Sequence, residues 1–261
     1  MRIIISPAKK MNADADSLPW ENLPQFLLQT EVLLHTLQGM DYAALQALWG
    51  CNDTIAALNI DRLRQMDLRK NLTPAHLCYE GIQYRYMAPG VFEDGQFQYV
   101  REHLRILSGF YGLLRPFDGV TPYRLELQAR LAVGDCRNLY DFWGDRLARQ
   151  LCRETDLIVN LASKEYSQAV AQHLPKTVRF LTCTFGELQP DKPEKVVEKG
   201  TQCKMARGEM VRYLAENGIT DPEEMKGFDR LGYAYSAELS AENQFVFVKK
   251  AGGKSAGEAF E

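Results

Sequence analysis

Two short aliphatic runs, each ending in a polar turn, limit the folds open to this chain. Arg2–Ile5 continues directly into Ser6-Pro7-Ala8-Lys9, and Asp156–Asn160 continues into Leu161-Ala162-Ser163. Short apolar runs bounded by turn residues are typical of buried strands, and ligands of open α/β sheets collect at the carboxyl edge of the strands. Both turns are therefore expected to line one crevice, unless they are ordinary strand-to-helix turns. Their polar side chains are Ser6, Lys9, Asn160 and Ser163.

Apolar residues at spacings of three and four predict that the first third of the chain is mainly helical. Asn52-Asp53-Thr54 offers a helix N-cap in this region. Later segments carry helix-like and strand-like patterns, including a terminal hairpin. The predicted helices are Leu23–Leu37, Tyr42–Leu48, Ile55–Leu63, Asp94–Leu107, Asp141–Arg153 and Lys204–Glu216, and the predicted later strands are Thr177–Thr184, Lys195–Val197, Tyr233–Tyr235 and Gln244–Val248.

Length and composition favour one compact domain. The 261 residues are 46% hydrophobic and 25% charged, which is ordinary globular composition. No linker or composition shift marks a domain boundary. We therefore expect an α/β (mixed α+β) fold with a central mixed sheet over residues 1–250, followed by a flexible, glycine-containing tail over residues 251–261.

Cysteines, histidines and apolar segments bear on location and cofactors. The six cysteines form no CxxC pair, the four histidines are scattered, and the N-terminal apolar run is too short for a signal-peptide core. No segment reaches the roughly 18 apolar residues that a membrane span needs. We therefore expect a cytoplasmic protein with reduced thiols, no membrane contact, no metal and no other cofactor.

Charge is distributed unevenly along the chain. The net charge of −3 counts against nucleic-acid binding unless the positive groups are segregated in space. From Arg101 to Arg153 there are nine arginines, six acids and no lysine. A guanidinium can hold two phosphate oxygens at once, which an ammonium cannot do. The segment is thus a mild sign of oxyanion recognition, and solvated helix faces with structural ion pairs are the alternative.

Two of these arginines stand in apolar or aromatic settings. Arg115 follows two leucines, and Arg124 lies in Pro122-Tyr123-Arg124-Leu125. A charge placed there must be paired or face a polar cavity, because burying it alone is very costly. Asp118 and Glu126 are the obvious partners. An internal salt bridge and a ligand contact both remain open for each arginine.

A second basic cluster lies in Cys203–Arg212. On a helix, its cations and one glycine fall within an arc of about 140°, at roughly 100° per residue. A glycine between cations would let a ligand approach the backbone. The residues of this face are Lys204, Arg207, Gly208 and Arg212. An ordinary surface helix is the alternative.

The turn between the first two predicted helices resembles a helix-hairpin-helix DNA motif. In that motif a glycine turn aims backbone N–H groups at a phosphate. Gly39 supplies the first glycine of Leu37–Leu45, but Asp41 stands where a second glycine is typical. An ordinary helix-turn-helix connection is therefore also open.

Taken in chain order, these motifs resemble those of the YaaA family of bacterial peroxide-stress proteins. The resemblance runs from Arg2 to Lys249 and implies a compact mixed α/β fold with a basic cleft and a helix-hairpin-helix element. It also implies DNA binding and a role in limiting oxidative damage, linked to lower free iron. The motifs are Ser6-Pro7-Ala8-Lys9, Leu107-Ser108-Gly109, Leu114-Arg115-Pro116, Pro122-Tyr123-Arg124-Leu125-Glu126, Phe142-Trp143-Gly144-Asp145, Asn160-Leu161-Ala162-Ser163 with Glu165-Tyr166, and Ala206-Arg207-Gly208.

The leading hypothesis is a DNA-binding protein of the peroxide-stress response that holds phosphates with little sequence specificity. An enzyme acting on a nucleobase or nucleotide in the same cleft is the second, although P-loop, Rossmann, serine-hydrolase and zincin motifs are absent. An iron-handling protein is the third. The predicted DNA contacts are Lys9, Gly39, Arg115, Arg124, Lys204, Arg207 and Arg212, with Tyr84, Tyr123 and Tyr166 for stacking or hydrogen bonding, and the predicted pocket lining is Ser6, Glu126, Asn160, Ser163 and Gly208.

Overall fold

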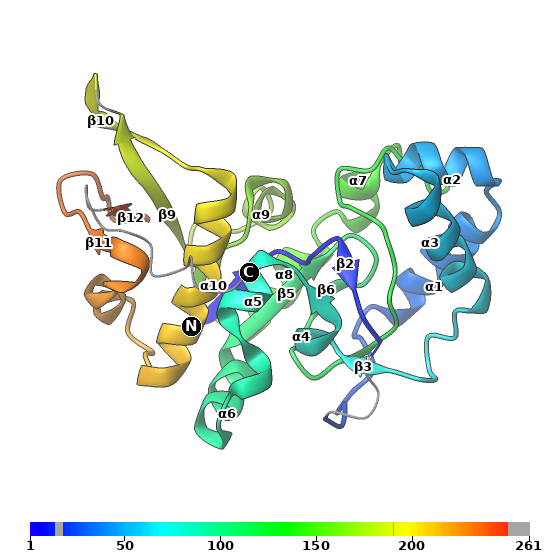
Figure 1. The fold of residues 1–261 in the computed structure, drawn as a ribbon, viewed down its shortest axis with the longest axis horizontal. Helices are drawn as coiled ribbons and strands as arrows, with labels where there is room; N and C mark the ends of the chain where they lie inside the picture. Colours follow the sequence, from blue (N-terminus) through cyan, green and yellow to red (C-terminus); the bar gives the residue numbers. More distant parts are fainter. Residues whose placement is uncertain (14–17, 190, 250–261) are drawn as a thin grey trace.

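A mixed β-sheet runs through the centre of the molecule, which a computed structural model describes for residues 1–13, 18–189 and 191–249 (Figure 1). Within these residues the sheet has eight strands in the order β11-β12-β9-β8-β1-β5-β6, with β10 paired to β9. The five strands β12, β9, β8, β1 and β5 are parallel to one another. The strands β11, β10 and β6 pair antiparallel with β12, β9 and β5, respectively. The bounds are β1 (Arg2–Ile5), β5 (Leu104–Ser108), β6 (Gly112–Leu114), β8 (Leu157–Leu161), β9 (Arg179–Gln189), β10 (Lys192–Val197), β11 (Tyr233–Tyr235) and β12 (Gln244–Lys249).

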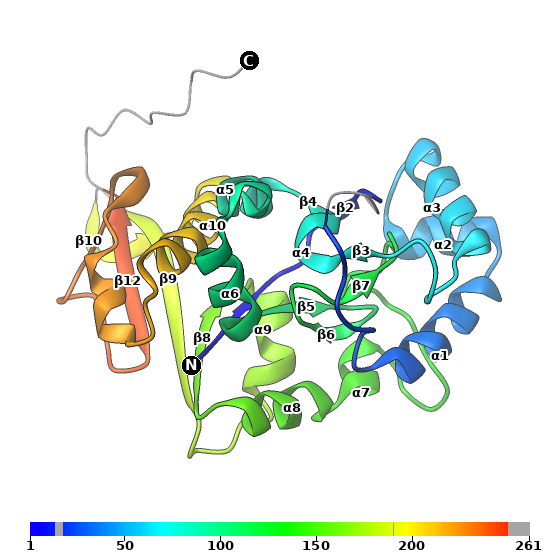
Figure 2. The same cartoon turned by 90° about the horizontal axis from the view of Figure 1, so that it is seen from below.

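Helices cover both faces of this sheet (Figure 2). α5, α6 and α10 lie on one side and α7, α8 and α9 on the other, while α1, α2 and α3 gather at one end of the molecule. The helices are α1 (Leu27–Gln38), α2 (Tyr42–Trp49), α3 (Asp53–Gln65), α4 (Ala75–Cys78), α5 (Ile82–Met87), α6 (Asp94–His103), α7 (Leu139–Trp143), α8 (Arg146–Glu154), α9 (Lys164–Ala171) and α10 (Gly200–Asn217), with 3-10 turns at Pro89–Val91, Pro222–Gly227 and Arg230–Gly232. The short strands β2 (Lys10–Met11) and β4 (Tyr79–Glu80) pair, as do β3 (Thr73–Pro74) and β7 (Gly119–Val120).

The expected mixed α/β fold in a single compact domain is confirmed. One cluster of buried apolar side chains joins the sheet to the N-terminal helices, with Ile4 of β1 and Leu33 of α1 both fully buried in it. The expected cap is also present, since Asn52 Oδ1 accepts a hydrogen bond of 3.0 Å from the backbone N–H of Ile55. The predicted tail, residues 251–261, lies outside the described residues.

The segment around Leu104 differs from the predicted helix. Helix α6 ends at His103, and Leu104–Ser108 is instead the buried strand β5, paired with β1 and β6. The stripe that includes Leu104 and Leu107 fits a helix by spacing, but pairing with β1 overrides that local preference. The predicted helix over Asp141–Arg153 is likewise two helices, α7 and α8, separated at Gly144, whose φ is +50°. The predicted terminal hairpin is present as β11 and β12.

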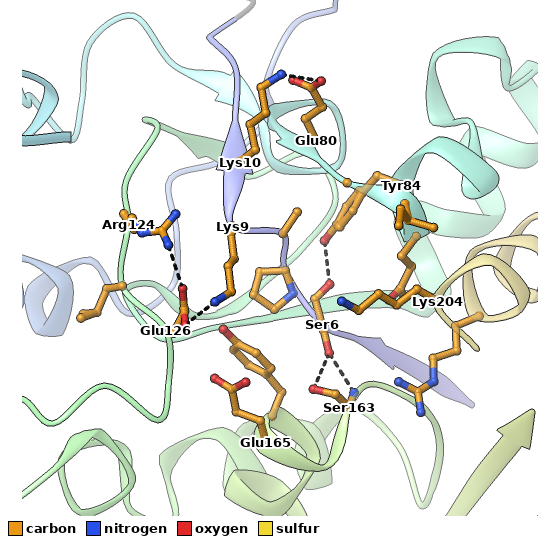
Figure 3. Close-up of a pocket in the computed structure, with 18 of the residues that line it drawn as sticks. Ser6, Lys9, Lys10, Glu80, Tyr84, Arg124, Glu126, Ser163, Glu165 and Lys204 are labelled. Carbon is orange, nitrogen blue, oxygen red and sulfur yellow. Dashed lines mark hydrogen bonds and ion pairs between the residues drawn. The ribbon is translucent and has the colours of Figure 1, made fainter. Parts of the chain in front are cut away.

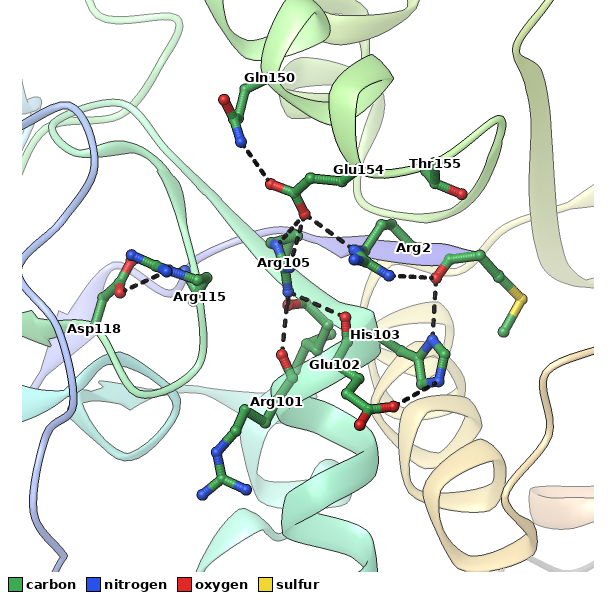
Figure 4. Close-up of polar contacts among 12 residues, drawn as sticks. Arg2, Arg101, Glu102, His103, Arg105, Arg115, Asp118, Gln150, Glu154 and Thr155 are labelled. Carbon is green, nitrogen blue, oxygen red and sulfur yellow. Dashed lines mark hydrogen bonds and ion pairs between the residues drawn. The ribbon is translucent and has the colours of Figure 1, made fainter.

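A shared carboxylate fixes β1 and β5 to the end of α8 (Figure 4). Glu154 Oε2 lies 3.0 Å from Arg2 Nε and 2.7 Å from Arg105 Nη2, and Arg105 is only 6% exposed. Burial alone would raise the pKa of Glu154, but hydrogen bonds from Gln150, Arg2 and Arg105 hold that pKa below its ordinary value. This network sits at the amino end of β1, opposite the turn that follows the strand.

No helix in the described part of the chain is both long and apolar enough to cross a lipid bilayer.

Candidate functional site

A cavity of about 380 Å³ opens at the carboxyl edge of β1, where β1 and β8 end side by side (Figure 3). Its volume is in the range of small-ligand sites. Segments that are far apart in the sequence converge on it. Its charged side chains are Lys9, Lys10, Glu80, Arg124, Glu126, Glu165, Lys204 and Arg207, and Ser6, Gln83, Tyr84, Tyr123, Ser163 and Tyr166 also line it.

The two polar turns meet on one wall of this cavity. The backbone N–H of Ser163 donates to Ser6 Oγ over 2.8 Å, and Ser6 Oγ donates in turn to Ser163 Oγ over 3.2 Å. The hydroxyl of Tyr84 on α5 donates to the carbonyl oxygen of Ser6 over 3.0 Å. Ser163 precedes α9, but its hydroxyl does not cap that helix. The parallel pairing of β1 with β8 therefore brings Ser6 and Ser163 together. The sequence predicted that both turns line one crevice, and both serines line this cavity.

An ion-paired carboxylate forms the opposite wall. Glu126 Oε2 accepts a hydrogen bond of 2.9 Å from Lys9 Nζ, and Glu126 Oε1 lies 3.5 Å from Arg124 Nη2 (Figure 3). The second contact is an ion pair without hydrogen-bond geometry, since Oε1 has no hydrogen-bond partner. Arg124 Nη2 also donates to the carbonyl oxygen of Trp49 over 3.4 Å. Arg124 is 11% exposed, and it both pairs internally and lines a polar cavity, while its contact with a ligand stays a prediction.

Helix α10 contributes two cations with different surroundings. Arg207 is 11% exposed and its Nη2 lies 3.1 Å from Glu198 Oε1. Lys204 is exposed, and its side chain forms no ion pair or hydrogen bond with the rest of the described chain. Lys204 is therefore free to meet an anion without giving up a partner.

The side chains that line this cavity include four buried polar atoms without hydrogen-bond partners. They are three N–H donors, Gln83 Nε2, Arg124 Nε and Arg207 Nε, and one acceptor, Glu126 Oε1. Leaving such a group unsatisfied costs about 1–3 kcal/mol, and native proteins keep few of them. The excess of donors fits a ligand that presents acceptor oxygens.

Glu165 on α9 adds a half-buried carboxyl to the same cavity. Burial raises its pKa, and the nearby charge of Glu126 raises it further, while the backbone N–H of Gln128 and the Lys9 ammonium act against the shift. The raised pKa makes the Glu165 carboxyl more ready to take up a proton than an ordinary glutamate.

The three predicted tyrosines line the cavity but are buried within its walls. The hydroxyl of Tyr123 lies between Tyr79 Oη at 2.9 Å and Ser108 Oγ at 2.6 Å, and burial raises the pKa of Tyr123 to about 12. Burial also raises the pKa of Tyr84 well above its ordinary value. Little ring surface is left for stacking, so these side chains shape the walls.

Several residues that were predicted as DNA contacts or pocket lining do not line this cavity. Their polar side chains pair with other groups of the protein instead. Arg115 Nε lies 3.2 Å from buried Asp118, and Arg212 Nε lies 2.7 Å from Glu216, further along α10 than Lys204. Asn160 is buried, and its Oδ1 accepts a hydrogen bond from the backbone N–H of Ala162 over 2.9 Å.

Gly208 also has a different role from the predicted one, since it does not line the cavity. The backbone of Gln83 on α5, and not a ligand, approaches Gly208, because a Cβ built there would overlap the Gln83 carbonyl oxygen. The glycine allows α10 to cross α5 closely, and this crossing holds Gln83 and Arg207 at the same cavity.

The helix-hairpin-helix interpretation stays a prediction. Two helices do flank Gly39, but Asp41 Oδ1 accepts the backbone N–H of Ala44 over 2.8 Å and so occupies one of the free donors at the start of α2. Neither the first cavity nor its neighbour is lined by Gly39. The neighbour, of about 670 Å³, is instead lined by side chains of α2 and shares Lys9 and Glu126 with the first.

Four polar residues of the site were not predicted as site residues from the sequence, namely Lys10, Glu80, Gln83 and Glu165. Glu165 could have been found, because it lies two residues after Ser163, in the first turn of the helix that follows the polar turn. Lys10 could have been found as well, because it directly follows Lys9 in the sequence. Gln83 carries no sequence signal, since its place depends on the contact between α5 and α10.

Within the described residues, no three His, Cys, Asp or Glu side chains are placed to hold a metal ion together. The iron-handling hypothesis therefore draws no support from this part of the chain.

Comparison with known proteins gives consistent matches over nearly the whole chain. A family model described as "Peroxide stress protein YaaA" matches residues 1–239. A "UPF0246 protein" of Desulfitobacterium hafniense (strain Y51) is 53% identical over 249 residues, covering 95% of this chain and 98% of the relative. A "UPF0246 protein" of Lachnoclostridium phytofermentans is also 53% identical, covering 95% and 96%. One of Pediococcus pentosaceus is 49% identical, covering 95% and 98%.

Proposed function

The chain belongs to the YaaA family of peroxide stress proteins, and from this premise we propose that it acts in peroxide stress by binding DNA phosphates in the cavity beside β1 and β8. Membership of the family supports the stress role. The DNA-binding part of the proposal rests on the site itself.

One observation carries the proposal. Gln83, Arg124 and Arg207, each with one buried N–H donor that has no hydrogen-bond partner, line one cavity together with the unpaired side chain of Lys204. Phosphate oxygens are acceptors that match such donors, and arginine is suited to hold two of them. The cations outnumber the carboxylates in the lining, with Lys9, Lys10, Arg124, Lys204 and Arg207 against Glu80, Glu126 and Glu165. The positive excess is therefore local although the whole chain is acidic.

Ion pairing makes the expected interaction modest. Lys9, Arg124 and Arg207 each already face a glutamate, so a phosphate has to compete with Glu126 and Glu198. Few phosphates can reach a cavity of this size. We expect sequence-independent binding whose log K falls with log salt at a slope between about −1 and −3, at about −0.9 per phosphate contacted.

A salt titration of duplex DNA binding, followed by fluorescence anisotropy, tests the proposal. Affinity should fall several-fold between about 50 and 200 mM salt, and two duplexes of different sequence should bind alike. Affinity that stays level over this range would rule out phosphate recognition.

A second candidate function, chemistry on a nucleobase or nucleotide, is favoured by Glu165. A half-buried carboxyl with a raised pKa, next to Lys9 and Glu126, is suited to general acid or base catalysis. Mass spectrometry of oligonucleotides incubated with the protein tests this function. A product that appears with the natural chain and not with Glu165→Gln supports it, and the absence of any product excludes it for those substrates.

A further inference from the structure

Two cavities adjoin at one ion pair. The pair of Lys9 and Glu126, 2.9 Å apart, lines both the first cavity and the neighbouring one of about 670 Å³. Lys9 is 65% exposed along its side chain, so its side chain is largely open to solvent even though its ammonium is paired with Glu126. The pair therefore forms a polar boundary between two spaces that one extended ligand can occupy together.

The second cavity has a different chemistry from the first. Helix α2 and the turn before it supply an apolar wall of alanine, methionine and leucine side chains. The strip after Glu126 supplies polar groups on the amide of Gln128 and the guanidinium of Arg130. Trp49 also lines this space; it is buried, and its indole N–H has no hydrogen-bond partner. The residues of the apolar wall are Met40, Ala44, Ala47 and Leu48.

A cavity lined by both an apolar wall and amide and guanidinium groups suits a flat heterocycle. The faces of a nucleobase are apolar, while its edges carry acceptors that arginine and glutamine N–H groups can meet. An aliphatic chain would offer no acceptor to the exposed side chains of Gln128 and Arg130, whereas the edge of a base offers acceptors to both.

We propose that the two cavities together bind one nucleoside phosphate unit, with the phosphate among the donors of the first cavity and the base against α2 in the second. The Lys9–Glu126 pair then lies at the level of the sugar, where the Glu126 carboxylate accepts a hydrogen bond from sugar or base. The phosphate half of this assignment rests on the proposed function, and the base half goes beyond it.

Calorimetric titration of the full chain with three probes tests the base half. The probes are inorganic phosphate, 2-deoxyribose 5-phosphate and deoxyadenosine 5′-monophosphate, which add a sugar and then a base to the same anion. The mononucleotide should bind about tenfold or more tightly than the sugar phosphate, which is a difference of about 1.4 kcal/mol or more in binding free energy.

A bulky substitution in the second cavity provides the decisive variant. Ala47→Trp should fill the space against α2, so that the mononucleotide binds no more tightly than the sugar phosphate while sugar phosphate affinity is unchanged. Ala43→Trp is the matched control, because Ala43 lies on the same helix, is exposed and does not line the cavity. Gln128→Ala provides a milder second variant should Ala47→Trp fail to fold, and it should reduce the same difference.

The outcomes separate the two proposals. Equal affinity for sugar phosphate and mononucleotide in the natural chain, or an Ala47→Trp variant that keeps the difference, overturns the base site while phosphate recognition stands. No measurable binding of any of the three probes or of duplex DNA overturns the proposed function as well. A dinucleotide that binds more tightly than the mononucleotide identifies DNA as the source of the unit, and the reverse order identifies a free nucleotide.

Discussion

Gly208 on α10 lies directly against the backbone of Gln83 on α5, with no room for a side chain between them. The contact joins the helix that carries Lys204 and Arg207 to the segment that carries Gln83 and Tyr84. Both segments line the same cavity, so the geometry of the site depends on a helix crossing that only glycine permits.

Gly208→Ala should therefore destabilise the protein and weaken phosphate binding together. Inserting a methyl group into a well-packed contact costs about 1–3 kcal/mol, even though alanine favours helix formation. Chemical denaturation measures the loss. Gly200→Ala on the same helix is the control, because a Cβ there meets nothing within 4 Å, and it should leave stability unchanged or slightly higher. Equal behaviour of the two variants would show that the helix crossing is not close.

Glu154→Gln should destabilise the protein strongly at neutral pH. The substitution leaves Arg105 buried without its counter-ion, and breaking a buried pair in this way costs about 3–5 kcal/mol. Because the pKa of Glu154 is lowered in the folded protein, its stabilising contribution is present above the ordinary value of 4.5 and is lost as pH falls below it. Denaturation curves at several pH values should show the gap to the natural chain shrinking in acid.

Asp145→Asn supplies the comparison for that variant. Asp145 pairs with Arg149 at the surface beside the same helix, and exposed pairs of this kind contribute about 0.5 kcal/mol or less. A loss as large as that of Glu154→Gln would contradict the account of the buried network.

His76 should make the fold sensitive to mild acid. Burial lowers the pKa of His76 to about 4, although its Nδ1 lies 2.6 Å from the carbonyl oxygen of Pro116. The unfolded chain therefore binds a proton at a higher pH than the folded chain, so stability falls as pH drops from about 6.5 toward 4, by up to about 3 kcal/mol from this group.

The natural chain compared with His76→Gln isolates this effect. Burial raises the pKa of nearby Asp118 to about 6, which acts in the opposite direction between pH 6 and its ordinary value of 3.8. Both chains keep Asp118, so only the difference between their denaturation midpoints reports on His76. A difference that does not change with pH would mean that His76 takes up its proton equally in both states.

Glu165 should make phosphate binding weaken as pH rises. Its raised pKa means that the negative charge forms above the ordinary value of 4.5, and the new carboxylate then repels an anion in the same cavity. Glu165→Gln should bind DNA more tightly at neutral pH and with a flatter pH profile, measured by anisotropy between about pH 5 and 8. Glu80→Gln is the contrast: its hydrogen bond from Lys10 keeps the pKa of Glu80 low, so the substitution should shift affinity without changing the profile.

How much of this could be read from the sequence depends on whether local pattern or tertiary contact decides each feature. The strand at Arg2–Ile5 and its polar turn were readable, because a continuous aliphatic run followed by Ser6-Pro7 has few other interpretations. The strand Leu104–Ser108 was not, because its apolar spacing also fits the preceding helix and only pairing with β1 decides between them.

The same distinction holds for the site. Lys9, Arg124 and Arg207 stood out by type and setting, and the fold brings them to one cavity. Arg212 shares a helix face with Arg207 by spacing, yet Arg212 forms an ion pair with Glu216 one turn later in the helix. Gln83 has no signal in the chain, since its importance comes entirely from the helix that crosses it.

Duplex DNA affinity of a matched pair of double variants tests the central claim. Lys204→Ala with Arg207→Ala removes two cations from the cavity, and Arg149→Ala with Arg212→Ala removes two that pair with carboxylates elsewhere. The two variants carry the same net charge. Anisotropy at one low salt concentration should show the first binding at least about tenfold more weakly than the natural chain and the second within about twofold. Equal losses in both variants would contradict a phosphate site in this cavity.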